Sequence, residues 1–184
     1  TGAITVNSGN LTLRNGQGHF SGSGAVGNLT VNSGGTFDFS TNLTDNYITL
    51  PTISLNSGAI TGTDAGNYGA NSYIGFYTSA INATGNSSMS GLYVTYLQAG
   101  SGTIAIDVSN GSTLSIGNVI RNAHATPNTT SVNKTSAGTL TLTGANTYTG
   151  DTTVTAGNLQ IGDGGTSGSL GTGNVSIAGN LTFN

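Results

Sequence analysis

Charged residues are scarce in this sequence, and their scarcity excludes several kinds of partner. Lys and Arg together number 3 and acidic residues 6 in 184 residues, so the formal net charge is −3 and charged residues make up 5% of the chain. An average soluble domain has about 25%. Three basic residues are too few to neutralise a phosphate backbone or to hold the chain on an anionic membrane surface. We therefore expect a neutral partner and no nucleic acid.

Cysteine, long apolar runs and helical patterns are also missing. The absence of cysteine excludes disulfides and thiolate metal ligands. No apolar run approaches the roughly 18 residues of a membrane-spanning helix, so we expect no membrane insertion by this segment. No window has apolar residues at i, i+3, i+4 and i+7, and no export signal opens the sequence. We interpret the sequence as an internal piece in which helices play little part.

Small polar residues and short apolar pairs make up most of the chain. It has 31 Gly, 31 Thr, 22 Asn and 21 Ser. Its apolar residues recur with period 2, which is typical of short strands with one buried face, and Gly-containing turns separate the pairs. The pairs are Ile4 and Val6, Leu11 and Leu13, Leu29 and Val31, Phe37 and Phe39, Ile48 and Leu50, Ile53 and Leu55, Ile104 and Ile106, Leu114 and Ile116, Leu140 and Leu142, Leu159 and Ile161, Val175 and Ile177, and Leu181 and Phe183.

A four-residue phrase repeats at a nearly constant spacing. Residues 6–9 and 31–34 both read Val-Asn-Ser-Gly, and residues 55–58 read Leu-Asn-Ser-Gly. Weaker echoes follow at Gly85, Gly111, Gly138, Gly157 and Gly179. A period of about 19–27 residues fits one coil of a solenoid whose coils hydrogen-bond to each other about 4.8 Å apart. We predict an all-β, single-stranded parallel β-helix (β-solenoid) of about 7–8 coils.

Stacked coils also account for the composition. Identical positions lie above one another, so a charge in the repeat would face a like charge one coil away, whereas Thr, Ser and Asn can hydrogen-bond along the stack. We predict a corner ladder of Asn7, Asn32 and Asn56. The Ser-Gly after each of them fits a corner at which the backbone adopts the left-handed conformation that Gly tolerates freely.

We expect one β-solenoid domain over residues 1–184, with two irregular segments. The subdivisions are regular coils at 1–66, an aromatic-rich irregular coil or excursion at 67–97, coils at 98–120, a surface loop at 121–134 and coils at 135–184. The segment at 67–97 holds half of the aromatic residues and is the candidate binding surface, because Tyr offers flat faces and hydroxyls that suit neutral sugars or a protein. Core or cross-strand packing is the competing interpretation. The candidate residues are Tyr68, Tyr73, Phe76, Tyr77, Tyr93 and Tyr96.

The most regular string in the chain lies at residues 134–162. It reads KTSAGTLTLTGANTYTGDTTVTAGNLQIG and resembles the autotransporter-associated β-strand repeat of Gram-negative autotransporter passenger domains. The matching positions, for which we expect structural roles, are Leu140, Leu142, Asn146, Tyr148, Gly150, Thr152, Val154, Gly157 and Leu159. The rest of the chain resembles the family through its period and composition.

This resemblance implies a right-handed parallel β-helix that is exported to the surface of a Gram-negative-type bacterium. Members of the family are often adhesins or large structural surface proteins. In that family the repeat is associated with passenger export and folding, and it is not a catalytic motif.

The titratable residues do not form a recognisable chemical site. Glycoside hydrolysis, which some parallel β-helices perform, needs two facing carboxylates. Only Asp38 and Asp64 are separated by about one period, which could place two Asp on neighbouring coils, and Asp38 is expected to face outward. His19 and His124 have no carboxylate or second His at ligand spacing. We therefore predict no catalytic residue, no metal, no cofactor and no enzymatic activity.

Several functions are compatible with these patterns. The leading hypothesis is a structural or adhesive extracellular segment, with other segments of the same passenger, neutral glycans or surface proteins of host or neighbouring cells as partners. The alternative is a filament subunit that stacks end to end with other copies through unpaired strand edges. Ice binding by Thr-rich strings such as Thr139, Thr141 and Thr143, and glycan cleavage, rank below both.

Overall fold

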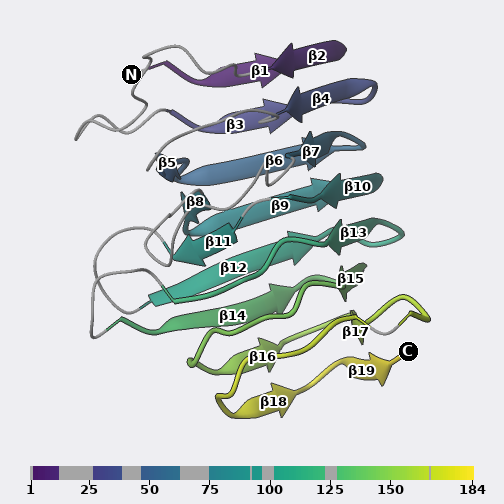
Figure 1. The fold of residues 1–184 in the computed structure, drawn as a ribbon. Helices are drawn as coiled ribbons and strands as arrows, with labels where there is room; N and C mark the ends of the chain where they lie inside the picture. Colours follow the sequence, from purple (N-terminus) through teal and green to yellow (C-terminus); the bar gives the residue numbers. More distant parts are fainter. Residues whose placement is uncertain are drawn as a thin grey trace.

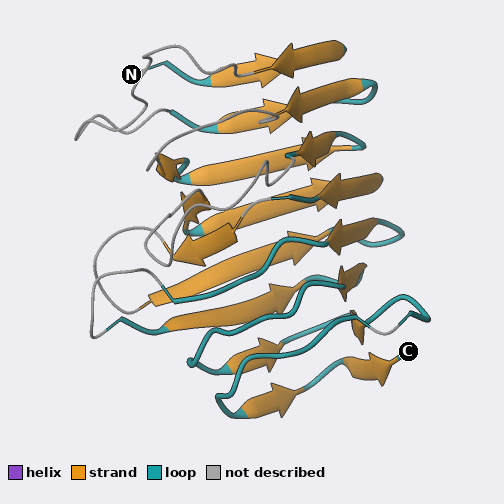
Figure 2. Cartoon of the chain, viewed as in Figure 1, coloured by secondary structure: helices purple, strands orange, loops and turns teal. Residues whose placement is uncertain are grey.

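The computed structural model describes residues 2–12, 27–38, 47–62, 75–91, 93–96, 102–122, 128–165 and 167–184. In these ranges the chain consists of strands and turns, all strand pairs are parallel, and no helix is present that could cross a membrane. The strands stack along one axis (Figures 1 and 2). The predicted all-β parallel solenoid is confirmed, whereas its hand and its number of coils stay predictions.

Two long sheets form the body of the solenoid. Sheet A consists, in spatial order, of β1 (Ile4–Val6), β3 (Leu29–Val31), β6 (Thr52–Asn56), β9 (Ala80–Thr84), β12 (Gly102–Val108), β14 (Thr130–Thr135), β16 (Thr152–Val154) and β18 (Val175–Ile177). Sheet B consists of β2 (Gly9–Thr12), β4 (Gly35–Asp38), β7 (Ala59–Thr61), β10 (Asn86–Met89), β13 (Thr113–Ile116), β15 (Thr139–Leu142), β17 (Asn158–Ile161) and β19 (Asn180–Phe183). Each strand of sheet A is followed in the chain by a strand of sheet B.

A short third sheet occupies the middle of the solenoid. Sheet C contains β5 (Tyr47–Thr49), β8 (Gly75–Thr78) and β11 (Tyr93–Tyr96), with β8 in the centre. It lengthens the coils to which it belongs. Ile60 and Met89 pair across a stretch of chain that includes β8, whereas Leu142 and Ile161 pair across a much shorter stretch that includes only β16. The longest coil thus extends slightly beyond the predicted period.

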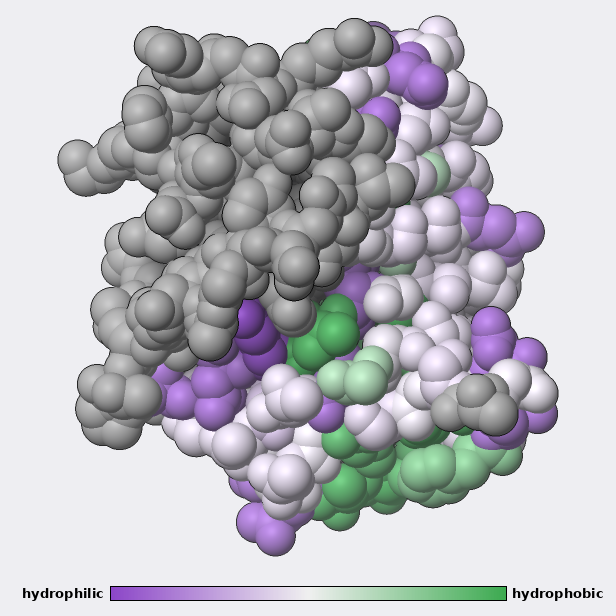
Figure 3. Space-filling model, viewed as in Figure 1, coloured by the Kyte–Doolittle hydropathy of each residue, from purple (hydrophilic) through white to green (hydrophobic). Residues whose placement is uncertain are grey.

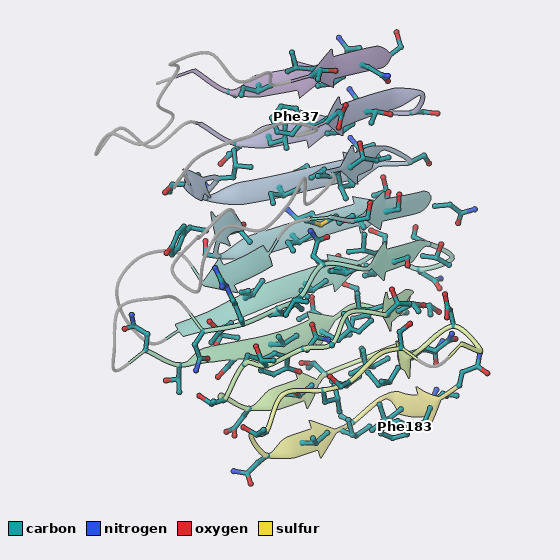
Figure 4. All side chains as sticks on the ribbon, in the orientation of Figure 1. Phe37 and Phe183 are labelled. Atoms are coloured by element: carbon teal, nitrogen blue, oxygen red, sulfur yellow. The ribbon has the colours of Figure 1, made fainter. Side chains whose placement is uncertain are left out.

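Alternation along each strand sends every second side chain into the interior. Leu29, Ile53, Ile81 and Ile106 pair in succession in sheet A, and each is 0% exposed. The predicted apolar pairs between Leu29 and Ile161 are buried wherever their side chains are described, whereas Leu13, Phe39 and the side chain of Ile48 lie outside the described part. The first and last strands are paired on one side only. Most of their apolar residues are therefore at least partly exposed, above all Phe183 at 69% in contrast to Phe37 at 1%, whereas Val6 stays buried at 6% (Figure 4).

The turn from sheet A to sheet B, here called the A–B corner, uses left-handed backbone. Seven of these corners contain a residue with positive φ, namely Gly9, Gly34, Ser57, Gly85, Gly111, Ser136 and Gly157. In the first two Asn-Ser-Gly phrases the glycine takes this conformation, as the sequence predicts. In the third phrase Ser57 takes it instead, with φ of 55°, and Gly58 packs against the backbone of Val31.

Two predicted segment boundaries need correction. The surface loop expected at 121–134 ends early, because Thr130–Thr135 forms β14 with Thr130, Val132 and Lys134 buried. These three side chains point inward at every second position, but the sequence did not reveal this pattern because the last of them is a charged lysine. The excursion expected at 67–97 is also narrower, since β9 and β10 continue sheets A and B in regular register. Residues 63–74, 92, 97–101 and 123–127 lie outside the described part.

Candidate functional site

The candidate site is the segment that resembles a known repeat, and it forms part of the continuous stack. Its strands β14 and β16 belong to sheet A, and β15 and β17 belong to sheet B. Leu140, Leu142, Val154 and Leu159 are all 0% exposed and face the common core. These four repeat positions supply the apolar columns that join the coils before and after the segment.

Asn146 lies where the chain returns from sheet B to sheet A without a strand. Its Oδ1 accepts a hydrogen bond of 2.8 Å from the backbone N–H of Ile120, and its Nδ2 donates a bond of 2.6 Å to the carbonyl of Ser169. The side chain therefore links the preceding coil to the following one. Asn146 is 6% exposed, so its two bonds add buried links between coils to the few backbone hydrogen bonds at this place, such as Thr147 N–H to the Ile120 carbonyl.

Tyr148 and Thr152 form a buried polar pair at the end of the same return. Their hydroxyl oxygens are 2.6 Å apart, and the residues are 0% and 1% exposed. Burial raises the pKa of Tyr148, and hydrogen bonding with the Thr152 side chain and with the backbone of Gly171 offsets part of this change. The pair satisfies both hydroxyls in the core, which removes most of the cost of burying them.

Two glycines of the repeat are required by close approach of neighbouring coils. A Cβ on Gly150 would lie inside contact distance of Ser131 Oγ and of the carbonyl of Thr130. Gly157 has φ of 73°, and a Cβ there would press on the carbonyl of Gly138. These repeat positions are therefore fixed by packing between coils and by backbone conformation.

Lys134, the first residue of the string, is a buried cation that the sequence analysis placed in a surface loop. It is 0% exposed, and its ammonium donates to the carbonyls of Thr135, Ser136 and Ala156 at 2.6, 2.7 and 3.2 Å. Burial lowers the pKa of Lys134, and the negative charge of Asp107 raises it in part. The signal that could have located it is the period of 2 with Val132, which puts residue 134 on the inward face.

The asparagines of the Asn-Ser-Gly phrases lie in line on the surface. Nδ2 of Asn32 donates to Oδ1 of Asn7, and Nδ2 of Asn56 donates to Oδ1 of Asn32, each at 2.8 Å. The hydroxyl of Thr84 continues the row by donating to Asn56 at 3.0 Å. The bonds are exposed to solvent, and they run parallel to the solenoid axis beside the A–B corners.

The aromatic candidates are only partly described. Tyr68 and Tyr73 lie outside the described residues, whereas Phe76 and Tyr77 are in β8 and Tyr93 and Tyr96 are in β11. The backbones of these four residues therefore meet in sheet C, where Tyr96 pairs with Thr78. Tyr77 is half-buried. For Phe76, Tyr93 and Tyr96 the description is limited to the backbone, so the choice between a binding surface and packing stays a prediction.

The described carboxylates lie apart from one another. Asp38 accepts a hydrogen bond of 3.3 Å from Thr61, while Asp64, its proposed partner, falls outside the described part, as do both histidines. Asp151 and Asp163 accept bonds from backbone N–H groups of turns at 2.9 and 3.3 Å. Within the described ranges no three His, Cys, Asp or Glu residues gather in a group that could hold a metal ion.

The Thr-rich string begins on one strand of sheet B, and its last residue, Thr143, lies just after that strand. Thr139 and Thr141 are both half-buried on β15. Their neighbours in register are Thr113 and Ser115 on β13, and Asn158 and Gln160 on β17. The ice-binding hypothesis would need the Thr pair to be repeated on the adjacent strands, and it is not.

Comparison with known families identifies the same stretch of the chain. The family described as the passenger-associated-transport-repeat matches residues 132–161. This range begins in β14 and ends with β17. No curated protein and no solved structure matches the chain. Residues 132–161 thus match the passenger-associated-transport-repeat, and this match within a parallel β-solenoid fits a segment of an autotransporter passenger.

Proposed function

We propose that this chain is a non-catalytic structural segment of an autotransporter passenger, exposed on or released from a Gram-negative-type bacterium. The observation that supports this proposal is the continuity of the stack through the repeat. Strand β14 pairs with β12 and β16, and β15 pairs with β13 and β17, with no break at either boundary of residues 132–161. The repeat therefore extends a column of coils and does not form a separate module.

The side chains of the repeat also favour a structural role. Asn146, Tyr148 and Thr152 use their polar groups for bonds within the stack. Gly150 and Gly157 allow neighbouring coils to approach. A rod held together in this way resists local opening, because each coil is fixed by hydrogen bonds and apolar contacts to both neighbours.

Export of the chain can be tested directly. The 184-residue chain is placed between an export signal and an outer-membrane barrel in a Gram-negative host, and intact cells are treated with protease. We expect a surface-exposed segment that protease releases only slowly. The control is Leu140→Asp, which puts a charge at a position that is 0% exposed and should make the segment easy to digest. Equal digestion of both chains would contradict a folded structural role.

A second candidate function is end-to-end association into a filament. Val175, Ile177 and Phe183 on the last strands are 45%, 38% and 69% exposed, and apolar surface gathers at this end of the molecule (Figure 3). Phe183 lies in the inward column that begins with Leu11, which is 37% exposed at the other end. A second copy placed in register would therefore cover apolar side chains with apolar side chains.

Light scattering and electron microscopy across a wide concentration range test this association. We expect the native chain to form elongated particles that grow with concentration, and Phe183→Ser to shift the distribution toward monomers. Monomers of the native chain at high concentration would contradict the filament.

An adhesive function would use sheet C, because this sheet collects the backbones of Phe76, Tyr77, Tyr93 and Tyr96. Its partners would be neutral glycans or surface proteins of host or neighbouring cells. Binding of the native chain to a panel of neutral glycans, and its loss in Tyr77→Ala with an unchanged circular dichroism spectrum, would support it. Equal binding by both chains would place the adhesive surface elsewhere.

A further inference from the structure

Lys134 differs from the other residues of its inward column. Ile106 pairs with Lys134, and Lys134 pairs with Val154, so the ammonium enters a column that is otherwise apolar at these levels. Among the described residues it is the one charged side chain that is buried. Each of its three hydrogens has a carbonyl acceptor, two on its own turn and the third at Ala156 in the next coil.

The same turn is held from outside by a carboxylate. Asp107 on β12 accepts hydrogen bonds at Oδ2 from the hydroxyls of Thr135 and Ser136, at 3.0 and 2.6 Å. Thr135 and Ser136 therefore give their carbonyls to the buried ammonium and their hydroxyls to the outer carboxylate. The two opposite charges do not need to touch, because they act on two faces of one dipeptide.

The turn needs this support because Ser136 has an unfavourable backbone conformation. Its φ is 62°, a region that costs a residue with a Cβ about 1–2 kcal/mol, and five of the seven left-handed A–B corners have glycine there. The other non-glycine residue with positive φ in the described chain is Ser57. The residue two positions before Ser136 is Lys134, whereas the residue two positions before Ser57 is the apolar Leu55. The Ser57 corner therefore serves as a natural control that has no buried cation.

We propose that Lys134 and Asp107 form a two-sided charge clamp that holds the Ser136 corner and fastens three successive strands of sheet A, namely β12, β14 and β16. The acceptors of the ammonium lie on the corners after β14 and β16, and the carboxylate lies on β12. Opening of the stack from the β18 and β19 side therefore stops at this corner. The clamp is a conformational latch in the fold, and it acts whether or not the chain has the function proposed above.

The two charges are expected to depend on each other. Asp107 is the charged group that acts on the Lys134 ammonium, and it favours the protonated form against the effect of burial. Hydrogen bonds to charged groups also polarise the peptide groups and hydroxyls between them, which strengthens both ends of the chain of bonds. Removing the lysine leaves three carbonyls without their hydrogen-bond donor in the interior. Removing the aspartate leaves two hydroxyls without their acceptor, but water can reach them.

Amide hydrogen exchange on the full chain is the first test. In Lys134→Met, which keeps an unbranched side chain without its charge, we expect amides of β14 to β17 to exchange roughly 100-fold faster, the scale of leaving buried carbonyls without their donor. Amides of β3, β4, β6 and β7 should keep their native rates. Native rates in β14 to β17 of this variant would overturn the clamp.

A double-mutant cycle tests the clamp even if Lys134→Met fails to fold. Ser57→Gly should lower the unfolding equilibrium constant of the native chain roughly fivefold, because glycine accepts positive φ. It should lower the constant of the Asp107→Ala variant by the same factor. Ser136→Gly should give little gain in the native chain, since it loses the hydroxyl bond to Asp107, and the full gain in Asp107→Ala. Equal gains for Ser136→Gly in both backgrounds would overturn the proposal.

Discussion

Replacement of Asn146 by alanine tests how much the repeat depends on its strandless return. The side chain makes two bonds, one from the Ile120 N–H at 2.8 Å and one to the Ser169 carbonyl at 2.6 Å. Asn146→Ala removes both and provides no substitute. The N–H belongs to a residue that is 0% exposed, so water cannot replace the lost acceptor.

The expected loss follows from what is left behind. A buried backbone group without a partner costs about 1–3 kcal/mol, and the smaller side chain adds a cavity of a few atoms. The buried N–H of Ile120 and the cavity together give a loss of about 2–4 kcal/mol in the free energy of unfolding, and the half-buried carbonyl of Ser169 adds less because water can reach it. This is a large part of the stability of an ordinary domain.

Urea unfolding followed by circular dichroism measures this free energy. Asn158→Ala is the matched control, because Asn158 also bonds to both neighbouring coils, to Thr139 at 3.3 Å and from Asn180 at 2.8 Å, but on the exposed surface. Water can replace both bonds of Asn158, so the control should lose less than about 0.5 kcal/mol. If the two variants were destabilised equally, the argument that burial makes the Asn146 bonds important would be wrong.

Three further predictions concern other repeat positions. Gly150→Ala should lower the free energy of unfolding by several kcal/mol in the urea titration, because the added Cβ would press on Ser131. Gly111 has a positive φ of 72° but open space around it, so Gly111→Ala should lower this free energy by only about 1–2 kcal/mol. Burial raises the pKa of Tyr148 above its ordinary value of 10.0, so the folded state holds this proton more tightly than the unfolded state does. The free energy of unfolding should therefore fall as the pH rises above about 10. Tyr148→Phe should reduce this fall in unfolding curves measured from about pH 8 to 11. Leu140→Ala should lose about 2–5 kcal/mol because Leu140 is 0% exposed, and a thermal midpoint equal to that of the native chain would contradict its place in the core.

Most strands of the two long sheets could be predicted from the sequence because their signals are local and repeated. An apolar residue at every second position puts one face of a strand inside, and a phrase that returns at a nearly constant spacing places the strands of successive coils side by side. The Asn-Ser-Gly phrases also predicted left-handed corners at Gly9 and Gly34. At Ser57 the conformation is one residue earlier, since Gly58 is needed where the next coil meets the backbone of Val31.

The polar interior could not be predicted from these rules. A charged residue is normally assigned to the surface, so Lys134 marked a loop in the sequence, although its neighbours Thr130 and Val132 alternate as a strand does. Its burial depends on carbonyls at Ser136 and Ala156, which come together only when coils stack. The same holds for Asn146, whose partners, Ile120 and Ser169, belong to the coils before and after it. Family resemblance marked the residue, but not what it binds.

Sheet C escaped prediction for a different reason. Its strands are short, with only two residues between β5 and β6 and one residue between β8 and β9 of sheet A. The pair Ile48 and Leu50 indicated a strand where β5 lies, but β8 and β11 carry aromatic residues, which suit a packed strand as well as a binding surface. The excursion predicted at 67–97 was therefore recognised by its composition, while its strands were not.

The pairing of sheets A and B determines how a chain of this kind can change in length. Each strand pairs with the strands one coil before and one coil after it in the chain, so the entropy lost on closing each coil is nearly the same and does not grow with the size of the protein. A whole coil could be gained or lost by recombination, and the columns on either side would still meet in register. A shift by one residue within a strand would instead turn its apolar side chains outward. Evolution of the rod is thereby restricted to discrete steps in length, each close to one coil.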